Sequence, residues 1–133
     1  MDLTLTPEQD DLASAVATML ASGTDPWTGL ASMGLLGLGI PEEDGGAGGT
    51  FADVFVVARA LGRAGARTPY VEGVIGSHLL PGPAERLVVL AHDEPGRRWQ
   101  VPGATGVRAE LDNAGTWRLT GTKEPVLHGA AAD

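Results

Sequence analysis

The order in which two hydrophobic patterns occur along this chain constrains its fold more than any other feature. Before Pro81-Gly82-Pro83, apolar residues recur at the spacing of a helix face; after it, they form short runs or alternate with polar residues, as in strands. Helices that come first and strands that come second indicate an α+β fold or two domains. We therefore predict an N-terminal all-α domain over residues 1–82 and the beginning of an antiparallel β-domain over residues 83–133.

Capping residues mark where the first two predicted helices begin. Thr6 precedes Pro7 and is followed three residues later by Gln9, which is the capping-box pattern. Asp25 followed by Pro26 predicts a second, short helix. Both signals combine a side chain that can accept an amide hydrogen bond with a proline suited to the first helical position.

Two more helices are predicted before the boundary. One follows the cap Thr50, and its apolar residues at helical spacing are expected to face inward: Phe51, Val54, Phe55, Ala58 and Leu61. The other starts at Thr68 and Pro69 and carries the apolar residues Val71, Val74, Ile75 and Leu79. Residues 34–49, between the second and third helices, are rich in glycine. We expect a tight loop there and not a phosphate loop, because the glycines follow a helix and reverse the order of the dinucleotide fingerprint.

The second part of the chain predicts short strands. Arg86–Ala91 is a largely apolar run that is typical of a buried strand. Val107–Leu111 and Thr116–Thr120 alternate like half-buried strands, and Asp112–Gly115 between them is a hairpin turn signal. Glu124–Leu127 is a candidate fourth strand, which its proline places at an edge or a bulge.

Composition excludes several classes of function. The net charge is −8 and no basic cluster occurs, so neither nucleic acid nor an anionic membrane is an expected partner. No apolar run approaches the ~18 residues that a membrane span needs. The chain has no cysteine, which excludes disulfides and thiolate metal sites. Because the N-terminus also lacks a signal-peptide pattern, we expect a cytoplasmic protein.

No residue pattern predicts catalysis by itself. The three histidines are isolated in the sequence, and Glu42-Glu43-Asp44 is typical of a solvated acidic loop. Asp93 and Glu94 are adjacent, so on a strand they would point to opposite faces and could not share a proton. The residues alone predict neither a catalytic residue nor a metal site.

Several motifs in the helical part resemble the acyl-CoA dehydrogenase family. Residues 33–48, MGLLGLGIPEEDGGAG, are similar to the "GLLGLGIPEEYGG" loop of the family's N-terminal helical domain, with Asp44 where an aromatic residue is common. Residues 5–9 resemble the opening "LTPEQ", residues 58–63 the helix end "EELGR", and residues 68–72 the helix start "PxPFxES". The motifs occur in the family's order.

The β-part resembles the same family. Residues 90–96 are similar to "ALTEPG", residues 117–123 to "YxLxGxK", and residues 129–133 to "GAxxAD". In the family these segments belong to a central β-domain that flanks the flavin. The resemblance implies that Leu90, Glu94 and Val126 contribute to cofactor binding, with main-chain contacts from Leu90 and Val126.

The resemblance also implies a larger fold and a reaction. Family members have an N-terminal helical domain, a central β-domain and a C-terminal helical bundle, and FAD lies between the last two, often beside a second subunit. They catalyse the α,β-dehydrogenation of acyl-CoA thioesters. A glutamate in the bundle removes the α-proton and the flavin accepts the β-hydride, so the hydride chemistry belongs to the cofactor.

This chain departs from the family at residues that would meet the flavin. Asp93 stands where a threonine of "TEP" hydrogen-bonds the flavin ring, and its negative charge would repel the flavin carbonyls. Pro125 and Leu127 stand where the family has a tryptophan and a hydroxyl donor. The chain also ends at Asp133, before the bundle that carries the base. We therefore predict no catalytic residue in this chain and no self-sufficient FAD site.

Two hypotheses follow. In the first, the chain is an acyl-CoA dehydrogenase-like flavoprotein subunit or fragment that forms a homo- or hetero-oligomer with another such subunit, and the assembly acts on acyl-CoA. Such a chain is either a truncated product of a longer gene or a catalytically silent subunit, since some members pair one active subunit with one degenerate subunit. In the second, the chain is a non-enzymatic helical scaffold. Bound flavin, which absorbs blue light, distinguishes the two.

Overall fold

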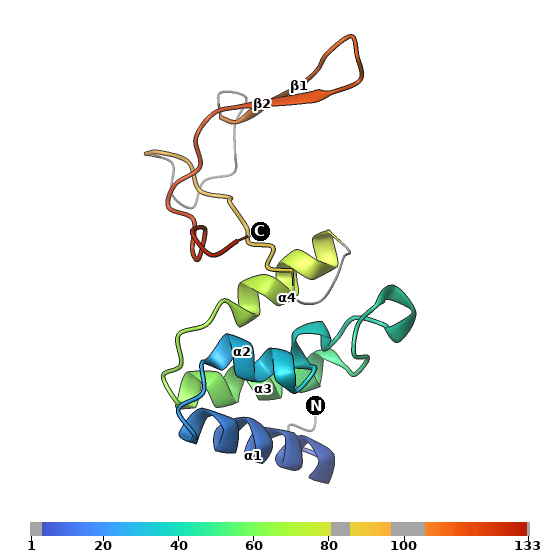
Figure 1. Ribbon diagram of the computed structural model, residues 1–133, viewed down its shortest axis with the longest axis vertical. Coiled ribbons are helices and arrows are strands. Elements are labelled where there is room, and N and C mark those ends of the chain that lie inside the picture. The colour runs from blue at the N-terminus through green and yellow to red at the C-terminus, as the bar shows by residue number, and fades with distance from the viewer. Residues whose placement is uncertain (1–3, 81–85, 97–105, 133) are drawn as a thin grey trace.

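The computed structural model describes residues 4–80, 86–96 and 106–132, and the helices precede the strands (Figure 1). Among these residues, four α-helices are followed by one two-stranded antiparallel sheet, which confirms the predicted α+β class. The predicted domain boundary at Pro81–Pro83 lies outside the described residues. The elements in chain order are α1 (Pro7–Ala21), α2 (Pro26–Ser32), the 3-10 turns η1 (Leu35–Gly37) and η2 (Glu42–Asp44), α3 (Phe51–Arg63), α4 (Tyr70–Leu79), β1 (Arg108–Leu111) and β2 (Trp117–Thr120).

The predicted caps of the first two helices are present. The Gln9 amide donates to the Thr6 hydroxyl at 3.3 Å, and the Thr6 amide donates to the Gln9 side-chain oxygen at 3.1 Å. At the start of α2, the Thr28 amide donates to Asp25 Oδ2 at 2.9 Å. These bonds satisfy amide groups that have no partner within the helix, so both helices begin where the sequence predicts.

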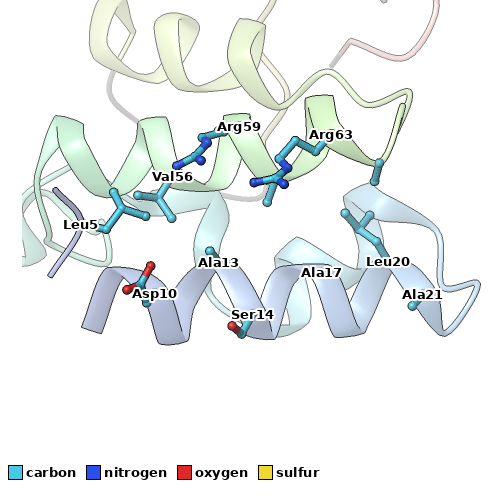
Figure 2. Close-up of a pocket in the computed structure, with 12 residues that line it drawn as sticks. Leu5, Asp10, Ala13, Ser14, Ala17, Leu20, Ala21, Val56, Arg59 and Arg63 are labelled. Carbon is cyan, nitrogen blue, oxygen red and sulfur yellow. The ribbon is translucent and has the colours of Figure 1, made fainter. Parts of the chain in front are cut away.

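A second capping box starts α3 and ties it to α1. The Thr50 amide donates to Asp53 Oδ2 at 2.7 Å, and the Gln9 side-chain amide donates to Asp53 Oδ1 at 2.9 Å. The Gln9 bond, followed by the Thr50 bonds, holds the pKa of the Asp53 carboxyl below its ordinary value. Because their first turns are joined, α1 and α3 lie side by side and run in the same direction (Figure 2).

One hydrophobic core serves the helical part of the chain. Its buried members come from all four helices and from the η1 segment: Val16, Leu30, Leu35, Leu36, Leu38, Val54, Val57, Leu61, Tyr70 and Val74. Burial of apolar area is the main favourable contribution to a fold of this kind, at roughly 25 cal/mol per Å2. The core therefore fixes the positions of the helices that carry the surfaces described below.

The buried side of α3 differs from the predicted one. Phe51 and Phe55 are 69% and 61% exposed, whereas Val56 and Val57 are almost fully buried. The other three predicted residues do lie toward the core. The helix has α1 along one side and the core along another, so its neighbours, and not its largest side chains, decide which residues are covered.

The segment Arg86–Ala91 is not the strand that its sequence predicts. It has no regular secondary structure, and it joins no sheet among the described residues. It lies against α4: a Cβ at Gly76 would come within 2.2 Å of the Val88 carbonyl oxygen, and one at Gly73 within 3.5 Å of the Leu87 side chain. Because α4 has no side chain at these points, the backbone of the segment packs directly on the helix instead of pairing with a strand.

The predicted hairpin is formed by β1 and β2. Ala109 pairs with Leu119 and Leu111 with Trp117, and Asp112 Oδ1 accepts two amides of the turn at 2.9 Å each. Every residue of both strands is exposed, so the expectation of half-buried strands is wrong for this chain. Side chains of paired residues share a face, so these four apolar residues form one uncovered face, which we call the hairpin face.

Candidate cofactor site

Two segments that are distant in sequence meet beside α4, and they carry the residues that the resemblance assigns to the cofactor. The Glu124 amide donates to the Asp93 carbonyl oxygen at 3.0 Å, and the Lys123 ammonium donates to the His92 carbonyl oxygen at 3.3 Å. Glu124–Leu127 is therefore joined to residues 92–94, although it is not the fourth strand suggested by its sequence. The contact brings Leu90, on the first segment, close in space to the second.

Glu94 anchors this junction from within. Its side chain is 7% exposed, and Oε1 accepts from Lys123 Nζ at 2.7 Å and from the Val107 amide at 3.3 Å. A Cβ at Gly106 would collide with the same carboxylate, so only glycine leaves room for it there. Glu94 thus holds together three segments of the second part of the chain, and its carboxylate is directed at protein groups.

Asp93 is the other buried acid of the junction. It is 7% exposed, and its Oδ1 lies 3.1 Å from His92 Nε2. A carboxylate accepts hydrogen bonds and, when ionised, donates none. The position that resembles the flavin-facing threonine therefore presents an acceptor where the family presents a donor.

A small pocket lies between this junction and α4. Its volume is about 250 Å3, which is below the 300–1,000 Å3 that is typical of small-molecule sites. Apolar side chains from the helix and from both segments line it together with three titratable groups: Val71, Glu72, Ile75, Leu90, His92, Asp93, Pro125 and Leu127. The pocket is apolar on most sides and acidic on one.

The lining of this pocket includes one of the three residues predicted to bind cofactor. Leu90 lines the pocket, whereas the Glu94 carboxylate is held by Lys123. Val126 is half-buried and starts a turn in which its carbonyl oxygen accepts from the Gly129 amide at 3.2 Å. Their cofactor role stays a prediction.

Two features of this region were missed from the sequence. The first is the contribution of α4, whose Val71 and Ile75 form one wall of the pocket. The second is the close packing of Arg86–Ala91 on that helix. The spacing of Gly73 and Gly76, three residues apart on one helix side, is the signal that could have revealed both.

The side chains at the positions that resemble the family's flavin contacts do not fit an isoalloxazine ring. Flavin carbonyl oxygens need hydrogen-bond donors, and the side chains beside the pocket at the positions that resemble the flavin contacts are Asp93, Pro125 and Leu127. The first only accepts in its ionised form, and the other two offer no polar group. The side chains of this chain alone therefore supply no donor at the positions that resemble the family's flavin contacts.

A larger groove lies between α1 and α3 (Figure 2). Its volume is about 790 Å3, and small side chains form half of its lining: Ala13, Ser14, Ala17, Ala21, Ala60 and Ala64. Arg59 and Arg63 extend from α3 over the groove, and Asp10 rises into it from the other helix (Figure 2). It is separate from the junction beside α4.

Neither a metal-binding cluster nor a membrane-spanning helix occurs among the described residues. Within the described residues, no group of three or more histidine, aspartate or glutamate side chains is arranged to hold a metal ion. No helix in that part of the chain has the length and apolar character required to cross a bilayer.

Comparison with known proteins is consistent with the fold and with the motifs. Residues 6–82 match the family described as "Acyl-CoA dehydrogenase, N-terminal domain". The whole chain superposes on one chain of the crystal structure of the ChsE4-ChsE5 complex from Mycobacterium tuberculosis, with a TM-score of 0.75 and 27% sequence identity, and spans 44% of that chain. Comparison with curated proteins finds no match. Because the matched domain covers more than half of its residues, the chain belongs to the acyl-CoA dehydrogenase family.

Proposed function

We propose that the chain is the N-terminal part of a non-catalytic subunit in an acyl-CoA dehydrogenase-type flavoprotein assembly. In this proposal the assembly carries out the α,β-dehydrogenation of acyl-CoA thioesters, and a second acyl-CoA dehydrogenase-like subunit supplies the flavin site and the base. The observation that carries the proposal is the buried Asp93 carboxylate at the position that resembles the flavin-facing hydroxyl. The family itself is FAD-dependent, so Asp93 is a difference between this chain and the family and does not change the chemistry proposed for the assembly.

The chemistry of Asp93 supports a silent subunit. Reduction of a flavin builds negative charge on the ring, and a buried carboxylate nearby would oppose it, because charges interact strongly where water is excluded. A threonine at the same position would instead donate a hydrogen bond to that charge. Aspartate in place of threonine would therefore weaken binding of the reduced, negatively charged flavin, which is the state that the family reaction produces.

The acids near the pocket also support the absence of a catalytic base. A general base must come within roughly 3 Å of the proton that it removes. Of the two acids at the pocket, Asp93 contacts His92, and Glu72 lies in the first turn of α4, outside any motif that resembles the family's base. We propose that neither abstracts a proton from an acyl thioester.

Exposed apolar surfaces support a role within an assembly. Val71, Ile75 and Leu79 of α4 are all more than 40% exposed, and so are Leu111, Trp117 and Leu119 of the hairpin face. Contiguous apolar patches of this kind are uncommon on soluble monomers and mark interaction sites. The matched structure is itself a complex of two differently named proteins, which is consistent with a hetero-oligomer.

A second candidate is a non-enzymatic scaffold, which the same exposed surfaces favour. The two candidates differ in what the complete assembly contains. A subunit of a dehydrogenase belongs to a flavin-containing assembly, whereas a scaffold belongs to a colourless one. For the location of either, we keep the cytoplasm as a prediction that rests on the cysteine-free composition.

An activity assay tests the proposal. The purified chain, supplied with FAD, is mixed with acyl-CoA thioesters of several lengths and an artificial electron acceptor, and reduction of the acceptor is followed. We expect no turnover by the wild-type chain or by the Asp93→Ala and Glu72→Gln variants. Turnover by the wild-type chain that either variant abolishes would refute the proposal.

A further inference from the structure

The outer side of α1 has an unusual composition. A surface helix ordinarily carries charged residues on the side that faces water. Residues 12–22, LASAVATMLAS, contain no charged residue, and all the acidic residues of the helix lie in its first turns. Leu12, Val16, Met19 and Leu20 belong to the core or pack against it, so the remaining residues present a small, uncharged outer side.

This side of α1 is one wall of the groove against α3, and the other wall is basic. Arg59 and Arg63 lie four residues apart on α3, both exposed, with their guanidinium groups over the groove (Figure 2). Neither arginine forms an ion pair with another described residue. In a chain of net charge −8, the groove thus combines alanine walls that permit close approach with two cations that form no ion pair among the described residues.

We propose that this groove is an interface between two copies of the chain, in which the α1 helix of each copy lies in the groove of the other in antiparallel orientation. The occupant must present small side chains to the alanine walls and at least one carboxylate to the pair of arginines. α1 itself has both properties, because Ala13, Ser14 and Ala17 form its outer side and Asp10 and Asp11 lie near its start. The surface is therefore self-complementary, as a two-fold interface requires.

The spacing along the helices is consistent with this pairing. Gln9 and Asp53 are hydrogen-bonded, so the two helices start level. At about 1.5 Å per residue, Asp10 lies roughly 1.5 Å and Arg63 roughly 15 Å beyond that level. A two-fold axis midway between them passes near Ser14, at roughly 7.5 Å. Around this axis, Asp10 of one copy meets Arg63 of the other, and the same contact is made twice.

Charge reversal provides the main test. In sedimentation velocity, the wild-type chain is expected to dimerise. The Arg59→Glu/Arg63→Glu variant and the Asp10→Arg/Asp11→Arg variant should each weaken dimerisation at least about tenfold, because like charges then face each other. Mixing the two variants should restore a dimer, since the all-acidic groove of one matches the all-basic groove of the other. Arg108→Glu/Arg118→Glu on the hairpin is the matched control and should dimerise like the wild type.

Cross-linking tests the position of the axis. The chain has no cysteine, so a single introduced thiol reports one position. Oxidised Ser14→Cys should form a disulfide-linked dimer, because the two copies of this residue lie close to the axis. Ser22→Cys, in the same helix, should not, since its two copies lie roughly 20 Å apart, beyond the ~7 Å between α-carbons that a disulfide can span.

Three results would overturn the proposal. They are a wild-type chain that is monomeric at all concentrations, a dimer that both charge reversals leave intact, and variants that do not associate when mixed. Circular dichroism of each variant verifies that it is folded. Because none of these results involves flavin or turnover, failure of this interface is distinguishable from failure of the proposed function.

Discussion

At the scale of single residues, Tyr70 combines deep burial with an unsatisfied polar group. The side chain is 1% exposed and lies in the helical core, and its buried hydroxyl has no hydrogen-bond partner among the residues that the structure describes. Burial raises the pKa of Tyr70 to about 12, because the charged phenolate is disfavoured away from water. The family motif that this segment resembles has phenylalanine at the same position, so we expect packing to require the ring and not the hydroxyl.

Tyr70→Phe is therefore expected to keep or raise stability. Leaving a buried polar group unpaired costs about 1–3 kcal/mol, and removing it recovers part of that cost. We expect the free energy of unfolding, measured with urea, to rise by up to about 1 kcal/mol. Tyr70→Ala, which removes the ring as well, should lose about 3–5 kcal/mol. A loss of more than 1 kcal/mol in the phenylalanine variant would show that the hydroxyl has a partner.

Asp53 makes the stability of the helical part depend on pH. Its folded-state pKa is lowered by the bonds from Gln9 and Thr50, so its contribution is present above the unfolded value of about 3.9 and is lost as the pH falls through the folded value. At neutral pH, Asp53→Asn should be less stable than the wild type, and the difference should shrink below about pH 4. Urea unfolding at pH 7, 4 and 3 measures it. A difference that does not change with pH would contradict the assignment.

At the scale of elements, the close packing of α4 on Arg86–Ala91 depends on the absence of side chains. A Cβ at Gly76 would lie 2.2 Å from the Val88 carbonyl oxygen, whereas one at Gly62 in α3 would meet nothing within 4 Å. Both glycines lie inside helices, where alanine is otherwise preferred by about 1 kcal/mol. The two positions therefore differ in this contact.

Gly76→Ala is expected to destabilise the chain, and Gly62→Ala to stabilise it by up to about 1 kcal/mol. In the first variant, amide exchange of residues 86–91 should accelerate, because the segment must move away from the helix. The exchange rates and the midpoint of unfolding provide the comparison. Equal stabilisation by both substitutions would mean that the segment does not lie on α4.

Local sequence signals predict where helices and turns begin, but they do not predict which neighbours pack against each element. Thr6, Asp25 and Thr50 act within one turn of chain, so the sequence reveals the helix starts, and Asp112–Gly115 likewise predicts the hairpin turn. Which side of α3 is covered, and whether Arg86–Ala91 pairs or packs on a helix, depend on neighbours that are distant in sequence. Those predictions were wrong for that reason.

At the scale of the whole molecule, the candidate site shows the same difference between local sequence signals and contacts between distant segments. The motifs assigned cofactor contacts to two segments, and these segments do meet beside α4, although the assignment itself stays a prediction. They could not predict that Glu94 would turn inward to Lys123, nor that a helix would form one wall of the pocket. Both outcomes depend on tertiary packing, which no single segment encodes. The α1–α3 groove had no counterpart among the sequence motifs, because its two walls lie at least 35 residues apart in the chain.

Three uncovered surfaces of the described residues are candidates for association. They are the groove between α1 and α3, the exposed apolar side of α4, and the hairpin face. The groove carries complementary charges along its length, whereas the other two are apolar. Self-association through the groove should therefore weaken at high salt, while association through the apolar surfaces should not. Sedimentation at low and high salt separates the two, and a dimer that strengthens with salt would point to the apolar surfaces instead.

The binding of FAD by the isolated chain tests the central claim most directly. The chain is dialysed against FAD and its blue-light absorption is compared with that of Asp93→Thr, which restores the hydroxyl donor, and of the exposed control Asp44→Thr. We predict that the wild-type chain and the Asp44→Thr control retain no flavin above the free concentration, and that any gain is confined to Asp93→Thr. A wild-type chain that retains one flavin per molecule would contradict the assignment of a silent subunit.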